Sequence, residues 1–321
     1  MKIKILTLFV LAAALMAGCR QAEPPQPEAD SILLGFAQLG AESAWRRGNT
    51  ESIKTAAREA GVQLMLENAE QKQEKQISDI RSFIAYQVDV IAFAPIVEDG
   101  WDNVLMEAKA AGIPVLTTDR MVNTEQEGLI AGFIGSNFYE EGVKAGEFLI
   151  KKREGMGDIR IVEISGTIDS TPMKQRAQGF RDVIAGHDEF KIIDTISGDF
   201  LRSKGKECME YLLNKHDGID VLYSHNDGMT LGAIEIIEAR GFVPGKDIII
   251  ITVDGEQAAI DLLRQGKINC VVECTPLIGD TIMELAKKLA AGETIAPITY
   301  SEERVFSEFD ADLDALPERA Y

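Results

Sequence analysis

The chain has 321 residues and a formal net charge of -19 at pH 7. A charge this negative excludes nucleic acid and anionic lipid surfaces as main partners, because both repel the protein at long range. The length exceeds what a single hydrophobic core usually serves, so we expect two lobes of ordinary domain size.

Residues 1–18 are predicted to be a secretory signal. Lys2 and Lys4 come just before an apolar run over residues 5–15. At roughly 11 residues this run is shorter than the roughly 20 that a membrane-spanning helix needs. The stretch that ends in Leu-Met-Ala-Gly-Cys resembles a bacterial lipobox, in which Cys19 receives lipid and becomes the first mature residue, although Met16 stands where leucine is commoner. We therefore expect an extracytoplasmic protein, lipid-anchored at the cell surface or on the periplasmic face.

Residues 19–31 are expected to be a flexible linker behind the lipidated cysteine. They contain prolines and several charges but no large apolar side chain, so they cannot bury enough surface to fold. Acyl chains on Cys19 would hold the folded body at the membrane. No later segment is apolar enough to span a bilayer.

Short apolar runs alternate with amphipathic segments along the first half of the body. The runs are typical of buried parallel strands, and the longer segments have helical spacing of apolar residues. Gly61 and Gly112 stand where helix C-terminal caps belong. The expected strands are residues 32–38, 62–66, 88–94 and 114–118, and the expected helices are 44–60, 73–86 and 101–111.

The same alternation restarts in the second half. Strands are expected at residues 159–164, 191–196, 220–224 and 247–253, with helices at 174–186, 203–215, 228–240 and 256–265. The pattern predicts an α/β protein with two similar doubly wound sheets, one after the other.

Three cysteines remain after Cys19 is set aside, and an odd number cannot all pair. If the segment from Cys270 to Cys274 is extended, these two lie about 13 Å apart, too far for a disulfide. We interpret Cys208, Cys270 and Cys274 as packing thiols.

Polar residues gather where the predicted strands end, and in doubly wound sheets ligands bind at the carboxyl ends of strands. The segments are residues 41–47, 94–99, 119–120, 166–171, 198–200, 225–227 and 254–255. No glycine-rich dinucleotide motif follows the first strand, and no phosphate-binding loop occurs. The three histidines lack metal-ligand spacing. The pattern therefore predicts no cofactor and no metal.

Carboxylates, guanidinium groups and aromatic rings together suit a neutral sugar. Each sugar hydroxyl both donates and accepts, so aspartate and arginine side by side satisfy it with charge-assisted hydrogen bonds. An aromatic ring covers the C–H face of the sugar. Trp45 and Phe200 lie in opposite halves of the chain, and a cleft between lobes would bring them together.

Several segments resemble the sugar-binding proteins of bacterial ABC importers, of the ribose and galactose type and closest to the galactofuranose-binding branch. They are residues 35–46, 71–76, 94–97, 119–120, 197–205 and 225–229, and the resemblance extends from Ile32 to Tyr321. It implies the type I periplasmic-binding-protein fold, with a three-segment hinge. Residues 32–135 plus 274–305 would form the N-terminal lobe, and residues 136–273 plus 306–321 the C-terminal lobe.

The resemblance also implies the ligand site. From the first lobe it assigns Glu42, Trp45, Arg46, Asp119 and Arg120, and from the second Arg176, Phe200, Asn226, Asp254 and Glu273. Of the neighbours Arg46 and Arg47, we expect Arg46 to face the ligand. Trp45 and Arg46 stand where ribose binders carry two phenylalanines, as in the galactofuranose branch, which argues against ribose.

The function implied is capture of one monosaccharide by hinge closure and its delivery to a membrane permease, by a monomer without catalytic activity. A protein that feeds a membrane sensor stays open as an alternative. So does a glycosidase that uses Asp119 and Asp254 as acid and base, although neighbouring arginines should keep both carboxylates ionised. The effector domain of a repressor is disfavoured, because the lipobox occupies the place of a DNA-binding helix. The identity of the sugar and its ring form stay open.

Overall fold

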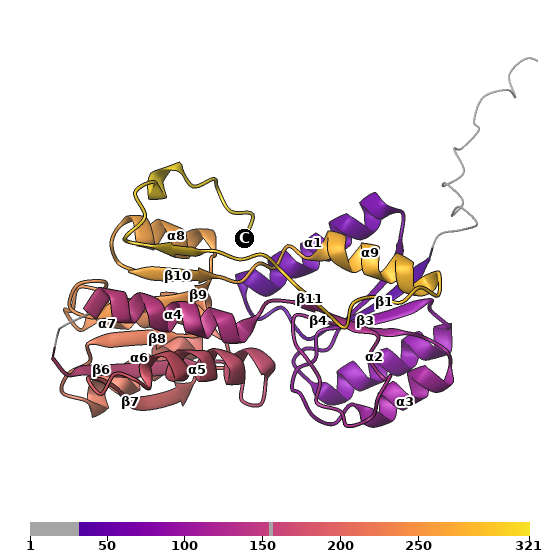
Figure 1. The fold of residues 1–321 in the computed structure, drawn as a ribbon, viewed down its shortest axis with the longest axis horizontal. Helices are drawn as coiled ribbons and strands as arrows, with labels where there is room; N and C mark the ends of the chain where they lie inside the picture. Colours follow the sequence, from indigo (N-terminus) through magenta and orange to yellow (C-terminus); the bar gives the residue numbers. More distant parts are fainter. Residues whose placement is uncertain (1–31, 154–156) are drawn as a thin grey trace, which may run out of the picture. The chain divides into compact units, whose positions relative to one another are not determined.

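The computed structural model describes residues 32–153 and 157–321. The predicted signal, the lipidated Cys19 and the linker lie outside the described residues. Within these ranges the chain forms two six-stranded sheets, each covered by helices (Figure 1). No helix in the described ranges is both long and apolar enough to cross a membrane.

The first sheet has the strand order β11-β5-β4-β3-β1-β2, and every neighbouring pair is parallel. Because a parallel sheet is buried on both faces, its strands are apolar runs. Helices α1 and α9 pack on one face, and α2 and α3 on the other. The strands are β1 Leu33–Gln38, β2 Gln63–Asn68, β3 Val90–Phe93, β4 Val115–Thr118, β5 Gly132–Gly135 and β11 Ile298–Tyr300, and the helices are α1 Ala44–Ala60, α2 Gln73–Tyr86, α3 Asp102–Ala110 and α9 Gly279–Ala290.

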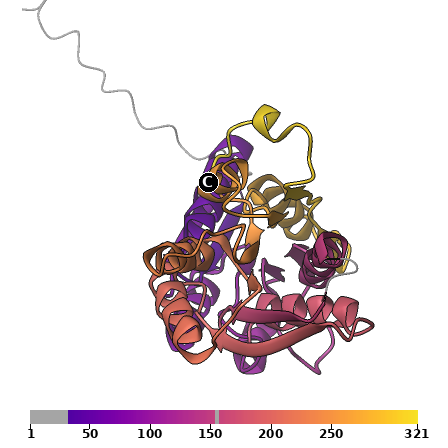
Figure 2. The same cartoon turned by 90° about the vertical axis from the view of Figure 1, so that its left-hand side faces the viewer.

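The second sheet repeats this architecture with the order β12-β10-β9-β8-β6-β7. Figure 2 turns this lobe toward the viewer. Helices α4 and α5 pack on one face, and α6, α7 and α8 on the other. Only the edge strand β12 is antiparallel. The strands are β6 Ile159–Ser165, β7 Phe190–Ser197, β8 Val221–Ser224, β9 Ile249–Asp254, β10 Cys270–Glu273 and β12 Val305–Ser307, and the helices are α4 Phe138–Arg153, α5 Thr171–Ile184, α6 Arg202–Lys215, α7 Asp227–Ala239 and α8 Gln257–Arg264. The predicted pair of doubly wound sheets is confirmed.

Local signals explain where the helices start and stop. The Ser43 side chain accepts a hydrogen bond from the Arg46 backbone N–H, and Gly61 ends α1 in the left-handed conformation with φ 67°. Helices α1 and α2 have the predicted bounds. Helix α5 begins at Thr171, three residues before the predicted start, because Pro172 is well tolerated in the first turn of a helix.

Three chain segments pass between the sheets: β5 to α4, β10 to α9 and β11 to β12. Val305 pairs with Val272 of the second sheet, so β12 begins one residue before the boundary that the sequence predicts. Cys208, Cys270 and Cys274 are free and buried, as expected for packing thiols.

Candidate functional site

A cavity lies where the carboxyl ends of the strands of both lobes meet. We call it the interlobe cavity. Nine of the ten predicted site residues line it: Glu42, Trp45, Arg46, Asp119, Arg120, Arg176, Phe200, Asn226 and Asp254. These side chains come from strand ends that are far apart in the sequence, as the doubly wound topology requires.

Arg46 is the centre of the polar network in the first lobe. Its Nη2 donates to Asp119 Oδ2 at 2.5 Å, and its Nε donates to Glu42 Oε1 at 3.3 Å. Arg46 is only 3% exposed, whereas its neighbour Arg47 is exposed. The pair therefore offers a fixed donor and a fixed acceptor side by side, which is the arrangement that a hydroxyl group needs.

Trp45 links the two lobes. Its indole Nε1 donates to the Cys274 carbonyl at 2.6 Å, and its backbone N–H donates to Glu256 Oε1 at 3.2 Å. The ring packs in the core cluster of the second lobe, although Trp45 belongs to α1 of the first. The first turn of α1 is thus held against the second lobe.

Arg120 and Phe200 meet across the cleft. The Arg120 guanidinium lies 5.3 Å from the centre of the Phe200 ring, and its Nη1 donates to the Ile96 carbonyl at 2.9 Å. Burial lowers the pKa of Arg120 to about 10, so the group stays charged at neutral pH. The Phe200 ring lies against Gly166, and a Cβ added to Gly166 would be only 1.9 Å from the ring. The position of the Phe200 ring therefore requires glycine at residue 166.

Arg176 is the corresponding cation of the second lobe. Its Nε donates to Glu141 Oε2 and its Nη1 to the His225 carbonyl, both at 2.6 Å. Its Nη2 lies 3.8 Å from Asp254 Oδ1. Glu141 is a buried anchor on α4 that sequence reasoning missed, because nothing near it in the chain indicates a partner.

Asn226 begins helix α7 at the end of β8. Its Oδ1 accepts from the Met229 backbone N–H at 3.0 Å, and its Nδ2 donates to the Phe200 carbonyl at 3.4 Å. Three other predicted site residues have positive φ angles: Asp119 at 60°, Phe200 at 62° and Asp254 at 125°. Such strained backbone concentrates at ligand sites, where the surroundings hold it in place.

The expectation that arginine keeps both aspartates ionised is wrong for Asp254. Burial raises the pKa of Asp254 well above its usual range, and the nearby Asp227 and Glu256 carboxyls raise it further, while Arg176 only partly compensates. The sequence could not show this, because Asp227 and Glu256 converge on Asp254 through tertiary packing. Asp254 therefore reaches the cavity as a group that can hold its proton.

Glu273 is the one predicted site residue that does not line the interlobe cavity. Its Oε1 accepts from Arg319 Nη2 at 2.5 Å, and its Oε2 accepts from the Arg304 backbone N–H at 3.0 Å. Side chains alternate in direction along a strand, so Cys274, the residue after Glu273, lines the cavity instead.

Four further residues line the cavity: Ser43, Phe138, Pro172 and Cys274. Ser43 and Pro172 start helices α1 and α5, and the preference of serine and proline for helix starts is the signal that could have located them. Phe138 opens α4, which the sequence analysis did not predict.

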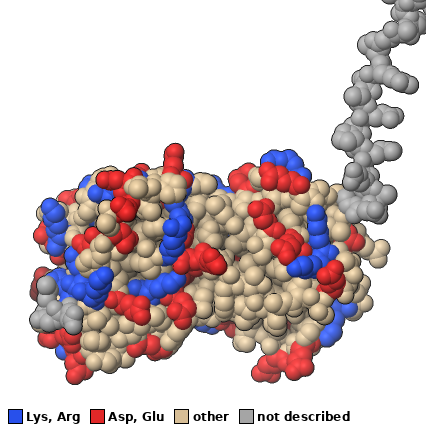
Figure 3. All heavy atoms as spheres, turned by 45° about the horizontal axis from the view of Figure 1, so that its top comes forward, with Lys and Arg blue, Asp and Glu red and all other residues tan. Residues whose placement is uncertain are grey.

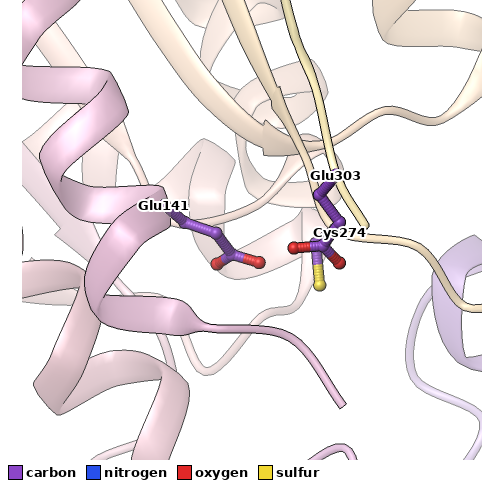
Figure 4. A group of neighbouring side chains, drawn as sticks. All are labelled: Glu141, Cys274 and Glu303. Carbon is purple, nitrogen blue, oxygen red and sulfur yellow. The ribbon is translucent and has the colours of Figure 1, made fainter. Parts of the chain in front are cut away.

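Next to the cavity, Ser136, Cys274 and Glu303 come from the three connecting segments and contact one another. Figure 4 shows Cys274 and Glu303 beside Glu141 of α4. Ser136 Oγ donates to Glu303 Oε1 at 2.5 Å and lies 3.3 Å from Cys274 Sγ. The Thr275 backbone N–H also donates to Glu303 Oε1, at 2.9 Å. Burial is the main cause that raises the pKa of Glu303 to about 8, and the nearby Glu141 contributes.

Glu141, Cys274 and Glu303 could in principle hold a metal ion, because their ligand atoms lie within 4.8 Å of one another. Burial raises the pKa of all three groups, which favours their protonated forms. Arg176 already donates to Glu141, and Lys144 donates to the Glu303 carbonyl. These two cations and the bound protons oppose a metal ion, so we assign none to the group.

Charged side chains of both signs lie on the surface. On the face in Figure 3, lysine and arginine side chains are interspersed with aspartate and glutamate and form no continuous basic patch. Ion pairs such as Arg81–Glu107 and Arg202–Glu235 join these charges on the exposed faces of helices.

Two similar α/β lobes with a polar cavity between them define a periplasmic binding protein, and the profile of the periplasmic binding protein domain matches residues 34–294. The chain belongs to this family. The galactofuranose-binding protein YtfQ of Escherichia coli (strain K12) is 38% identical over 260 residues, which cover 80% of this chain and 81% of that protein.

Two solved structures are similar over nearly the whole described body. A Mycobacterium smegmatis protein in complex with β-D-fucofuranose has a TM-score of 0.86 and 47% identity, covering 89% of this chain and 93% of its own. The periplasmic binding protein of the arabinose ABC transporter from Shewanella sp. ANA-3, bound to α- and β-L-arabinofuranose, has a TM-score of 0.83 and 40% identity, covering 86% and 92%.

Proposed function

We propose that this protein is the substrate-binding component of a carbohydrate ABC importer and that it captures a monosaccharide in its furanose form. The observation that carries the proposal is the interlobe cavity, where Arg46 and Asp119 face Arg176 and Asp254 from the other lobe. Similarity to proteins solved with fucofuranose and arabinofuranose supports the furanose ring form.

The cavity residues have complementary roles toward a sugar. Arg46, Arg120 and Arg176 donate, Asp119 accepts, and the Asn226 amide can do both. Asp254, which tends to hold its proton, can donate to a ring or hydroxyl oxygen. Trp45 and Phe200 supply apolar surface for the C–H groups. An analogue that lacks one hydroxyl would leave a buried polar group without a partner, which is the basis of selectivity.

Closure follows from contacts that join the lobes. Besides Trp45, the Met121 backbone N–H donates to Thr171 Oγ1 at 3.0 Å, and Lys174 forms an ion pair with Glu98 at 2.6 Å. A ligand favours the closed form only through contacts that the open form lacks. A sugar bound between Asp119 and Arg176 supplies such contacts, and the permease then recognises the closed protein. The first lobe would consist of residues 32–135 and 274–304, and the second of residues 136–273 and 305–321. The hinge would consist of the three segments that connect these lobes.

The test is thermal unfolding of the purified protein with galactose, ribose, arabinose, glucose, methyl β-D-galactofuranoside and the matching pyranoside. A ligand that binds only the folded state raises the unfolding midpoint. We expect a selective rise for one sugar, larger for the locked furanoside than for the pyranoside. A folded sample that responds to none of them would contradict the proposal.

Adjacent arginines provide a matched control. Arg46→Met removes the buried guanidinium of the cavity, whereas Arg47→Met makes the same change at the exposed neighbour. The sugar-induced rise should disappear in the first variant and persist in the second. Equal responses in both would show that the sugar binds elsewhere.

We expect the sugar to leave the site chemically unchanged. The raised pKa of Asp254 resembles that of a general acid and is the one feature that favours a glycosidase. However, Asp119 is already paired with Arg46 at 2.5 Å, which hinders its action as the base. Release of nitrophenol from a nitrophenyl furanoside would favour the enzyme instead.

The remaining expectations are a monomer, an anchor through lipidated Cys19 at an extracytoplasmic membrane face, and a permease or else a membrane sensor as partner.

A further inference from the structure

A second cavity adjoins the interlobe cavity, and we call it the adjoining chamber. Gln71 and Ile96 of the first lobe line it, together with Thr167, Asp199, Leu201 and Lys204 of the second. Glu42 and Arg120 line both spaces, so the two spaces share a wall. The chamber is larger than the interlobe cavity. Its size therefore does not exclude a second sugar unit.

The shared wall contains a buried acceptor without a partner. The Glu42 side chain is only 4% exposed; its Oε1 accepts from Arg46, but its Oε2 has no hydrogen-bond partner. Gly40 lies close to both Glu42 and Gln71, since a Cβ built on it would be 2.8 Å from Glu42 Oε2 and 3.0 Å from Gln71 Cγ. Gln71 lines only the chamber. A buried carboxylate oxygen without a donor is costly, and a ligand hydroxyl would satisfy it.

The remaining wall has the chemistry of a carbohydrate site. Lys204 pairs with Asp199, and Asp199 Oδ1 also accepts from Ser197 Oγ at 3.1 Å. Thr167 adds a hydroxyl, and Leu201 and Ile96 add apolar surface. Donors and acceptors therefore face each other from the two lobes, as they do around the interlobe cavity.

We propose that the adjoining chamber is a second glycosyl subsite, so that the protein also captures furanosyl disaccharides, with one unit in each space. This inference rests on the proposed function, because the first unit occupies the proposed monosaccharide site. The shared residues Glu42 and Arg120 would contact both units at the glycosidic linkage. The imported substrate class is then short furanosides as well as free furanose.

The test compares matched ligands by isothermal titration calorimetry of the purified protein. One pair is methyl β-D-galactofuranoside and a disaccharide of two galactofuranose units. The other pair is L-arabinose and 1,5-linked arabinobiose, whose units are arabinofuranose. For the pair whose monosaccharide binds, the disaccharide should bind at least as tightly as the monosaccharide.

Two variants fill the chamber without touching the interlobe cavity. Leu201→Trp and Thr167→Trp change residues that line only the chamber. Each should weaken disaccharide binding at least about tenfold and change monosaccharide binding less than about threefold. Leu277→Trp is the matched control, because Leu277 is 51% exposed and lies outside both spaces. Unfolding midpoints of the variants check that each is folded.

The outcomes separate this inference from the proposed function. Binding of the monosaccharide without the disaccharide overturns the subsite and leaves the proposed function standing. Equal weakening of both ligands by Leu201→Trp and Thr167→Trp also overturns it, since the chamber would then be part of the monosaccharide site. Binding of neither ligand overturns the proposed function and the subsite together.

Discussion

Two buried ion pairs dominate the site at the scale of single residues, one in each lobe. Arg46 pairs with Asp119, and Arg176 pairs with Glu141 at 2.6 Å. Buried charges of this kind contribute little net stability, but removal of one partner leaves the other uncompensated. Their main effect is to hold donors and acceptors in place before the ligand arrives, which reduces the cost of ordering side chains on binding.

Asp119→Asn should weaken sugar binding roughly 30-fold or more, because it removes a charged acceptor and leaves Arg46 without its partner at 2.5 Å. Calorimetric titration with the sugar identified in the unfolding screen measures the change. Asp261→Asn makes the same substitution at a side chain that is 50% exposed on α8 and should leave the affinity unchanged. Wild-type affinity in Asp119→Asn would remove this carboxylate from the site.

At the scale of elements, helix starts and the three connecting segments place the site residues. Helix α1 begins directly after Ser43, so its first turn carries Trp45 and Arg46 to the cleft. Helix α7 does the same for the second lobe, since its capping residue Asn226 is itself part of the cavity wall. In both lobes a capping side chain fixes the direction of the chain at the point where the ligand binds.

Ser43→Ala should lower the stability by about 1 kcal/mol, since the first turn of α1 loses the acceptor for the Arg46 backbone N–H at 3.1 Å. For a protein of this size, the unfolding midpoint should fall by about 2–4 °C. Ser78→Ala changes an exposed serine within α2 and should have no such cost. A midpoint that falls equally in the two variants would show that the cap is unimportant.

Glu303→Gln should remove part of the pH dependence of stability. The pKa of Glu303 is raised from 4.5 to about 8, so the unfolded chain releases this proton at lower pH than the folded protein does. Stability therefore falls as pH rises from about 5 to about 8, by at most ~1.4 kcal/mol per pH unit. Glutamine stays neutral and can still accept from Ser136 and Thr275.

The measurement is the unfolding midpoint of both proteins across that pH range. Wild type should lose stability more steeply than Glu303→Gln, and the curves should meet near pH 5. Glu302→Gln, at the exposed neighbouring residue, should follow wild type. Parallel curves for Glu303→Gln and wild type would mean that this carboxyl titrates normally.

For the whole molecule, the balance between open and closed forms decides the affinity. Polar contacts join the lobes beside the packing of Trp45, and hydrogen bonds and ion pairs of this kind can break when the cleft opens. When the closed form is only partly populated, the observed affinity falls by the same fraction. A single contact between the lobes can therefore change binding without touching the sugar.

Glu256→Ala removes the acceptor for the Trp45 backbone N–H at 3.2 Å and should shift the protein toward the open form. We expect sugar affinity to fall about five- to tenfold, from the loss of about 1 kcal/mol in the closed state. Without sugar, the radius of gyration from small-angle scattering should increase. Glu238→Ala, at a 44% exposed side chain on α7, is the control. An unchanged affinity in Glu256→Ala would show that this contact does not bias closure.

Much of the fold was predictable because its signals are local. Apolar runs of strand length alternate with helical periodicity, and Ser43 and Gly61 bound α1. The site was partly predictable for a related reason: in doubly wound sheets the carboxyl ends of strands converge, so polar residues at those ends meet. Asp119 after β4 and Asp254 at the end of β9 are examples.

The sequence by itself determined the class of fold, the two lobes and the polar character of the cleft, because each depends on residues close together in the chain. Only the tertiary structure decided that Glu273 turns to Arg319, that Glu141 anchors Arg176, and that Glu303 joins the three connecting segments. The raised pKa of Asp254 and the adjoining chamber also follow only from the tertiary structure. Burial and pairing depend on which distant residues pack around a group, and no local pattern records that.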